Sequence, residues 1–228
     1  MVKVLTFSPR GAPDLRPFEV INVPLLELEP SVNPEEVKEA LKRAEAVAFT
    51  SPTGVRFLFE RVPELRELLK DKVVYAIGPK TKEELEKYGI EAKLPKEFHS
   101  LSLAEELKRY SKVVAFRSDK ASKTMKEVLG DKLIEVVICK TVRKPKPEIV
   151  QLIREVDAVV VSSAEIGRAL LESIRFAGES PKILDGKLIV IGPEAAKPLR
   201  GLRYEIAPRA SFEGVREKLL ELFKSYNG

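Results

Sequence analysis

The sequence contains one cysteine, Cys139, one histidine, His99, and no tryptophan in 228 residues. A single cysteine cannot form a disulfide within the chain. Together with one histidine it supplies too few soft ligands for a zinc or iron–sulfur site. We therefore predict a protein that has no disulfide framework and binds no metal.

Long apolar runs are also missing, since no uncharged stretch approaches the roughly 18 residues that cross a bilayer. The first residues, MVKVLTFSPRG, enter a strand-like pattern directly and contain no apolar secretory segment. With 44% hydrophobic and 33% charged residues, the chain reads as a globular protein. We expect it to be soluble, cytoplasmic and independent of membranes.

The charge excess is small, because 40 Lys and Arg against 35 Asp and Glu give +5, and no basic arm concentrates it. A mildly basic protein suits an anionic partner. Aromatic residues make up only 7%, and no motif interleaves them with basic residues for base stacking. We therefore expect a small anionic molecule as the partner rather than nucleic acid, and a monomer.

Common catalytic signatures are absent too. The sequence has no Walker A pattern, no glycine-rich dinucleotide fingerprint and no nucleophile elbow, so no organic cofactor is predicted. A histidine-dependent nucleophile would have to use His99, which lies just before a predicted helix. We favour a loop or helix-capping role for His99 over a catalytic one.

An internal repeat is the most informative feature that is present. Three segment pairs match at similar offsets, 158 − 46 = 112, 191 − 77 = 114 and 112 − 3 = 109. They are 46–51 (AVAFTS) with 158–163 (AVVVSS), 77–79 (IGP) with 191–193 (IGP), and 3–7 (KVLTF) with 112–116 (KVVAF). Similar offsets at three places indicate two related halves.

Each half alternates short apolar strands with amphipathic helices, which predicts doubly wound α/β units with parallel sheets covered on both faces. The expected strands are 2–7, 46–50, 73–77, 113–116, 157–161 and 187–191. Segments 19–28 and 133–142 are longer, more polar at their ends and followed by proline-bearing connections. We interpret both as crossings between two domains, one of them discontinuous in sequence.

Asn33 is expected to cap a helix that begins at Pro34.

Ligands of open parallel sheets bind beyond the carboxyl ends of the strands, where helix N-termini point. Four strand-to-helix turns here combine hydroxyls or glycine with amides at a helix start, which is suited to an anion. Ordinary helix starts have the same composition, so each turn alone is weak evidence. The turns are Thr50-Ser51-Pro52-Thr53-Gly54, Gly78-Pro79-Lys80-Thr81, Ser162-Ser163-Ala164-Glu165 and Gly192-Pro193-Glu194-Ala195.

Arg117 ends a predicted strand at the same edge and could bind a carboxylate or phosphate. The alternative, a solvated arginine at a helix start, is equally compatible with the sequence. Arg10 occupies the corresponding turn of the other half.

Taken in order, FTSPTGV at 49–55, IGPKT at 77–81, VSS at 161–163 and IGPEAA at 191–196 resemble the uroporphyrinogen-III synthase family across essentially the whole chain. The resemblance implies two flavodoxin-like or Rossmann-like α/β domains, 1–29 with 146–228 and 30–145. It also implies a two-stranded β connection and an active-site cleft between the domains. The implied reaction closes the linear tetrapyrrole hydroxymethylbilane to uroporphyrinogen III, with inversion of ring D and no cofactor.

The resemblance also implies substrate-binding positions, many of which act through backbone amides: Thr50, Ser51, Gly78, Pro79, Thr81, Ser162, Ser163, Gly192 and Pro193. Two residues depart from the family pattern. Cys139 stands where a strand motif of the form Tyr-x-Thr-Val usually has tyrosine, and Ala195 stands where threonine is common.

The implied substrate carries eight carboxylates, and its reaction requires departure of one hydroxyl and positioning of ring D. Cys139 could donate the proton, but a buried apolar role for this thiol is favoured. We hypothesise that a water molecule or Lys140 assists the leaving hydroxyl instead. The rival interpretation is a non-catalytic module of the same fold that binds a tetrapyrrole or small anion.

Overall fold

A computed structural model of the chain describes residues 1–224. The chain divides into two compact units. Unit 1 comprises Met1–Glu27 and Val142–Gly228, and unit 2 comprises Leu28–Thr141. Each unit contains a five-stranded sheet, ordered β10-β9-β8-β1-β2 in unit 1 and β3-β7-β6-β4-β5 in unit 2.

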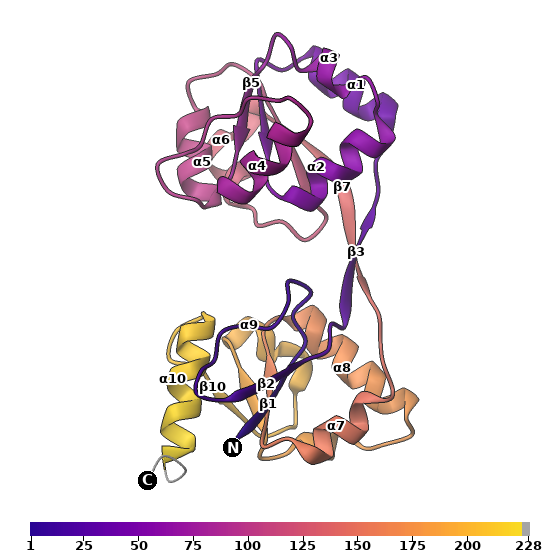
Figure 1. The fold of residues 1–228 in the computed structure, drawn as a ribbon, viewed down its shortest axis with the longest axis vertical. Coiled ribbons are helices and arrows are strands. Elements are labelled where there is room, and N and C mark those ends of the chain that lie inside the picture. The colour runs from indigo at the N-terminus through magenta and orange to yellow at the C-terminus, as the bar shows by residue number, and fades with distance from the viewer. Residues whose placement is uncertain (225–228) are drawn as a thin grey trace. The chain divides into compact units, whose positions relative to one another are not determined.

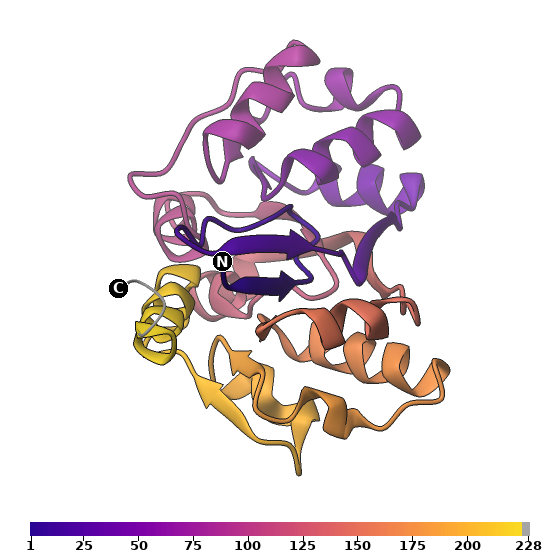
Figure 2. The ribbon, with the colours of Figure 1, turned by 60° about the horizontal axis from the view of Figure 1, so that its bottom comes forward.

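In unit 1 every strand pairs in parallel with its neighbours. Numbered by chain order within the unit, the sheet reads 2-1-3-4-5, the flavodoxin-like order. Figure 2 shows β1 and β2 lying side by side. The elements are β1 (Lys3–Thr6), β2 (Glu19–Asn22), α7 (Ile149–Glu155), β8 (Ala158–Val161), α8 (Ala164–Phe176), β9 (Leu188–Val190), α9 (Pro193–Ala196), β10 (Tyr204–Ile206) and α10 (Phe212–Leu222).

In unit 2, β4 pairs in parallel with β5 and β6, and β6 pairs in parallel with β7. The elements are β3 (Leu26–Pro30), α1 (Pro34–Lys42), β4 (Ala46–Phe49), α2 (Pro52–Arg61), α3 (Leu65–Leu68), β5 (Val73–Ala76), α4 (Pro79–Lys87), α5 (Ser100–Leu107), β6 (Val113–Ser118), α6 (Thr124–Leu129) and β7 (Leu133–Arg143). Short 3-10 turns cover 130–132 in unit 2 and 181–184 and 197–199 in unit 1.

Both faces of each sheet are covered, because successive strand residues point to opposite sides. In unit 1, Leu5 and Val159 pack with α7 and α8, whereas Val4 and Val160 pack with α10. Figure 1 shows α7 and α8 in orange and α10 in yellow. Unit 2 repeats this arrangement, with α1, α2 and α4 on one face and α5 and α6 on the other. The predicted class, two doubly wound α/β units, is confirmed.

The internal repeat corresponds to the pairing of the strands. β4 lies between β5 and β6, and β8 lies between β9 and β1, so the three segment pairs found in the sequence occupy equivalent places. In unit 2, an isolated parallel β-bridge joins Tyr75 of β5 to Lys93. It occupies the position that the pairing of β10 with β9 occupies in unit 1. Unit 1 is therefore a circularly permuted copy of the unit 2 topology.

One expected element differs from the structure. Segment 19–28, interpreted as one crossing, is two strands, and only the second, β3, pairs with β7. The break falls at 23–25, where Pro24 lacks a backbone N–H for a ladder. β3 and β7 run antiparallel, since Ser31 N donates to Ile138 O while Lys144 N donates to Leu25 O.

Candidate functional site

Each unit brings its predicted polar turns to the carboxyl edge of its sheet. The strand order reverses at β4 and β6 in unit 2 and at β8 and β1 in unit 1. Such a switch point is where doubly wound sheets bind ligands. Thr50 and Ser51 follow β4, and Ser162 and Ser163 follow β8.

Ser51 and Ser163 are helix N-caps with matching geometry. The Ser51 Oγ accepts from Gly54 N at 2.9 Å, and the Ser163 Oγ accepts from Ile166 N at 3.1 Å. Each hydroxyl keeps its own proton for another acceptor. The Thr50 hydroxyl is already engaged, because it donates to Phe116 O at 3.0 Å. Ser162 is half-buried beside the Ser163 cap.

The two glycine–proline turns also correspond. Gly78 caps α4 and Gly192 caps α9, both with extended backbone and without a side-chain capping bond. Pro79 and Pro193 take the first helical position, where no donor is lost. The third position differs: Thr81 is 2% exposed in α4, whereas the equivalent residue in α9 is Ala195.

Arg117 lies within β6, and its side chain is 4% exposed. The Nη1 atom donates to Glu135 Oε1 on β7 at 3.2 Å, and the buried Nε has no hydrogen-bond partner. The sequence suggested that Arg117 ends its strand at the ligand-binding edge. In the structure β6 continues one residue further, to Ser118, and the Arg117 side chain is buried. Because the Arg117 side chain is buried in this structure, a ligand could contact its guanidinium only after that side chain became exposed.

The end of β1 in unit 1 depends on Asn22, which the sequence analysis missed. The Asn22 Oδ1 accepts from Thr6 Oγ1 at 2.7 Å and from Ser8 N at 2.9 Å, and its Nδ2 donates to Ser8 O at 3.0 Å. These bonds shape the turn that presents the exposed Arg10. Asn22 pairs with Thr6 as Glu135 pairs with Ala115, so it occupies the place that Glu135 holds in unit 2.

The end of β7 contains a bulge, where the pairing shifts between Arg117 and Ser118. Ile138 and Cys139 are therefore both buried, although successive strand residues normally face opposite sides. Lys140, next in the strand, is exposed. Burial, with a smaller contribution from the charge of Asp119, raises the pKa of Cys139 above its ordinary value. Cys139 is thus a protonated, enclosed thiol at neutral pH.

Alkylation should reveal this enclosure. We expect Cys139 to react with iodoacetamide at pH 8 about a hundredfold more slowly in the folded protein than in urea. Because folding raises the thiol pKa, the unfolded chain loses this proton first as pH rises. Stability should therefore fall as pH rises above the unfolded pKa, and Cys139→Ala should remove that part of the alkaline loss. Equal reaction rates in buffer and urea, measured by mass spectrometry, would contradict the buried position.

His99 is a capping residue, as the sequence analysis favoured. Its Nδ1 accepts from Ser102 N at 3.2 Å, and its Nε2 contacts Glu97 Oε2 at 2.6 Å. Within residues 1–224, no cluster of three or more His, Cys, Asp or Glu side chains could hold a metal ion. Among the helices of that same range, none is long and apolar enough to cross a membrane.

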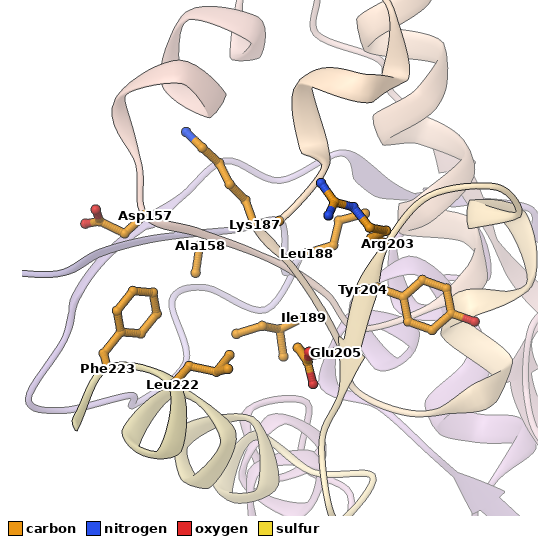
Figure 3. Close-up of a pocket in the computed structure, with 11 residues that line it drawn as sticks. Asp157, Ala158, Lys187, Leu188, Ile189, Arg203, Tyr204, Glu205, Leu222 and Phe223 are labelled. Carbon is orange, nitrogen blue, oxygen red and sulfur yellow. The ribbon is translucent and has the colours of Figure 1, made fainter. Parts of the chain in front are cut away.

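The cavity drawn in Figure 3, of about 370 Å³, lies at the opposite edge of the unit 1 sheet. Its lining comes from the starts of β8, β9 and β10 and from the end of α10, with Asp157, Lys187 and Tyr204 among the labelled residues. A hollow of about 510 Å³ with Lys72 and Lys93 in its wall occupies the equivalent place in unit 2. We attribute both cavities to the repeated topology, and neither contains a predicted site residue.

The comparisons with known proteins agree over most of the chain. The family profile "Uroporphyrinogen-III synthase HemD" matches residues 15–217. A curated protein of Archaeoglobus fulgidus, named provisionally as a uroporphyrinogen-III synthase, is 36% identical over 191 residues, which are 77% of each chain.

Two solved structures share the fold. The uroporphyrinogen-III synthetase of Helicobacter pylori has a TM-score of 0.62 at 18% identity, with 97% of this chain and 100% of that chain covered. The uroporphyrinogen III synthase of the extremely thermophilic bacterium Thermus thermophilus has a TM-score of 0.52 at 18% identity, with both chains fully covered.

Proposed function

Because the chain belongs to the uroporphyrinogen-III synthase family, we propose that it cyclises hydroxymethylbilane to uroporphyrinogen III. In this reaction ring D is inverted and water is lost. The observation that carries the proposal is the duplicated set of polar strand ends in a member of this family. Ser51 and Ser163, with the turns at Gly78 and Gly192, present hydroxyls and helix-start amides in both units.

The substrate's chemistry suits these groups. Carboxylates bind favourably to backbone N–H groups and partial positive charge at helix N-termini. A net charge of +5 adds a weak attraction for a polyanion. In our proposal, Thr50, Ser51, Thr81, Ser162 and Ser163 with the two glycine–proline turns bind substrate carboxylates. Arg117 joins them if its guanidinium is uncovered when substrate binds.

Departure of the hydroxyl requires one proton. The C–O bond of the terminal hydroxymethyl group breaks, water leaves, and ring D attacks the remaining azafulvene cation through its substituted carbon. For ring D to end inverted, the bond between that carbon and its original bridge must then break. The bridge rejoins ring D at its unsubstituted carbon, which loses its proton. The Cys139 thiol is enclosed, with a pKa raised by burial, which weakens its candidacy as the donor. We assign this role to a water molecule or to Lys140, which is exposed one residue further along β7.

The assay generates hydroxymethylbilane in situ and separates the uroporphyrin isomers after oxidation, with and without the protein. We expect mainly isomer III with the protein, and isomer I without it, because spontaneous closure does not invert ring D. We expect Cys139→Ala to retain most of this activity. Isomer I at the spontaneous level would refute the synthase and favour a module that binds a tetrapyrrole or anion without chemistry. The cysteine in place of the family tyrosine is the one feature that favours this alternative.

Ser51→Ala should lower kcat/KM about tenfold, the effect of losing one hydrogen bond to a charged group. Ser51→Ala also removes a helix cap, which costs about 1 kcal/mol of stability. Ser180→Ala is the matched control, since the Ser180 Oγ caps a turn through Lys182 N at 3.3 Å on the opposite edge. If Ser51→Ala and Ser180→Ala had the same kcat/KM, the hydroxyl of Ser51 would have no role in binding substrate.

A further inference from the structure

Phe98 is an exposed aromatic residue at the carboxyl edge of unit 2. Its side chain is 58% exposed, although large apolar side chains are usually covered. It lies beside the turn that starts α4, because a Cβ placed on Gly78 would be 3.5 Å from the Phe98 Cβ. Phe98 therefore lies next to Gly78, the residue that caps α4.

The loop that carries Phe98 is ordered by hydrogen bonds on its C-terminal side. Ser102 N donates to His99 Nδ1, His99 Nε2 contacts Glu97 Oε2, and Glu97 N donates to Ser102 Oγ at 3.1 Å. These bonds fix the residues on both sides of Phe98. Its exposure therefore follows from a defined backbone position.

Comparison of the two units shows that the fold does not require an aromatic residue here. In unit 1, the residue next to Gly192 is Ala210, whose Cβ would be 3.6 Å from a Cβ on that glycine. The offset, 210 − 98 = 112, equals the offset between the repeated segments 46–51 and 158–163. His99 and Ser211, the residues that follow, both cap helices.

The two turns also differ in charge and hydroxyl content. The first turn of α4 contains Lys80 and Thr81 and no acidic residue. The first turn of α9 contains Glu194 and Ala195. Because Thr81 is 2% exposed, the groups that the unit 2 turn offers a ligand are the Lys80 charge and the exposed ring of Phe98, and the first turn of α9 has neither equivalent. A ligand that matches both is an aromatic ring that carries carboxylates.

We propose that Phe98 contacts the substrate directly, with one pyrrole ring packed against its phenyl ring and that pyrrole's carboxylates directed to the Gly78–Thr81 turn. This inference rests on the proposed function, because it takes the ligand to be a carboxylated polypyrrole. Aromatic rings prefer offset or edge-to-face packing, which tolerates different ring orientations. The lack of an equivalent aromatic residue in unit 1 makes the two turns unequal, so one substrate ring is held differently from the others.

The test uses Phe98→Ala, Phe98→Tyr and the control Phe176→Ala. Phe176 is also 58% exposed, but it ends α8 and contacts Arg175. The probes are uroporphyrin III, titrated by fluorescence, and citrate, a carboxylate without a ring. Phe98→Ala should weaken uroporphyrin III binding about tenfold while Phe98→Tyr and Phe176→Ala stay within about twofold of the parent. Citrate competition should be the same in all four proteins.

The isomer assay on the same proteins separates the two proposals. If the parent forms isomer III and Phe98→Ala binds and turns over like Phe176→Ala, the contact is wrong and the synthase stands. If the parent forms only isomer I but Phe98→Ala still loses uroporphyrin III affinity selectively, the contact stands and the synthase is wrong. Equal loss of citrate binding in Phe98→Ala would show a disturbed turn and would also overturn the proposed ring contact.

Discussion

Replacing Asn22 with alanine is expected to lower the free energy of unfolding of unit 1 by about 3 kcal/mol. The substitution removes three hydrogen bonds at once and leaves the Thr6 hydroxyl and the Ser8 N–H, both in buried residues, without the Asn22 acceptor, whereas Ser8 O keeps the bond from Gly11 N. Each buried polar group left unpaired costs about 1–3 kcal/mol. The turn that presents Arg10 should loosen.

Asn33→Ala is the matched control. Asn33 is an exposed cap of α1, which accepts from Glu35 N at 3.1 Å and Glu36 N at 3.4 Å. Its loss should cost about 1 kcal/mol. Because two units need not unfold together, hydrogen exchange resolved by peptide is the appropriate measurement. Equal effects of the two substitutions, or unchanged exchange in β1 and β2 of Asn22→Ala, would contradict the role given to Asn22.

Replacing Gly214 with alanine should have a comparable effect for a steric reason. A Cβ at this position would lie only 2.2 Å from the backbone oxygen of Arg209 and 3.0 Å from its carbonyl carbon. Alanine in a helix normally stabilises relative to glycine by up to about 1 kcal/mol. Here the backbone of 209–211 or the start of α10 must move. We expect a net destabilisation of about 3 kcal/mol.

Glu213→Ala serves as the control for this second substitution, because Glu213 is exposed in the same helical turn. It should change stability by less than about 0.5 kcal/mol. Exchange of amides in α10 and β10 should rise in Gly214→Ala and stay unchanged in Glu213→Ala. A Gly214→Ala protein as stable as the parent would mean that the Arg209 turn adapts freely.

Much of the fold could be predicted because its signals are local. The apolar runs at 46–50 and 157–161 indicated buried parallel strands, and Ser-Pro and Gly-Pro pairs marked helix starts that the structure confirms at Ser51 and Gly78. The repeat then related the two halves, since similar offsets at three places indicate strands that occupy equivalent positions in the two sheets. Segment 19–28 was predicted wrongly as one continuous element. Pro24 lacks a backbone N–H, and whether this interrupts a strand depends on whether a neighbouring strand would accept a hydrogen bond at that position.

The site was less predictable because its residues act through partners distant in sequence. Ser51 was found from its own motif. The role of Asn22 depends on Ser8, which is 14 positions away, and nothing local distinguishes this asparagine from a solvated one. The burial of Arg117 likewise depends on β7, which follows it by about 18 residues and brings Glu135 alongside.

By itself, the sequence determined the two-unit α/β architecture, the repeat and the polar turns, because period, proline and capping chemistry act within a few residues. Only the tertiary structure decided which side chains are enclosed and which are presented. The β7 bulge encloses Cys139, the strand pairing covers Arg117, and the capped loop exposes Phe98 beside Gly78. Exposure depends on what the rest of the chain packs against each residue, and no local pattern contains that information.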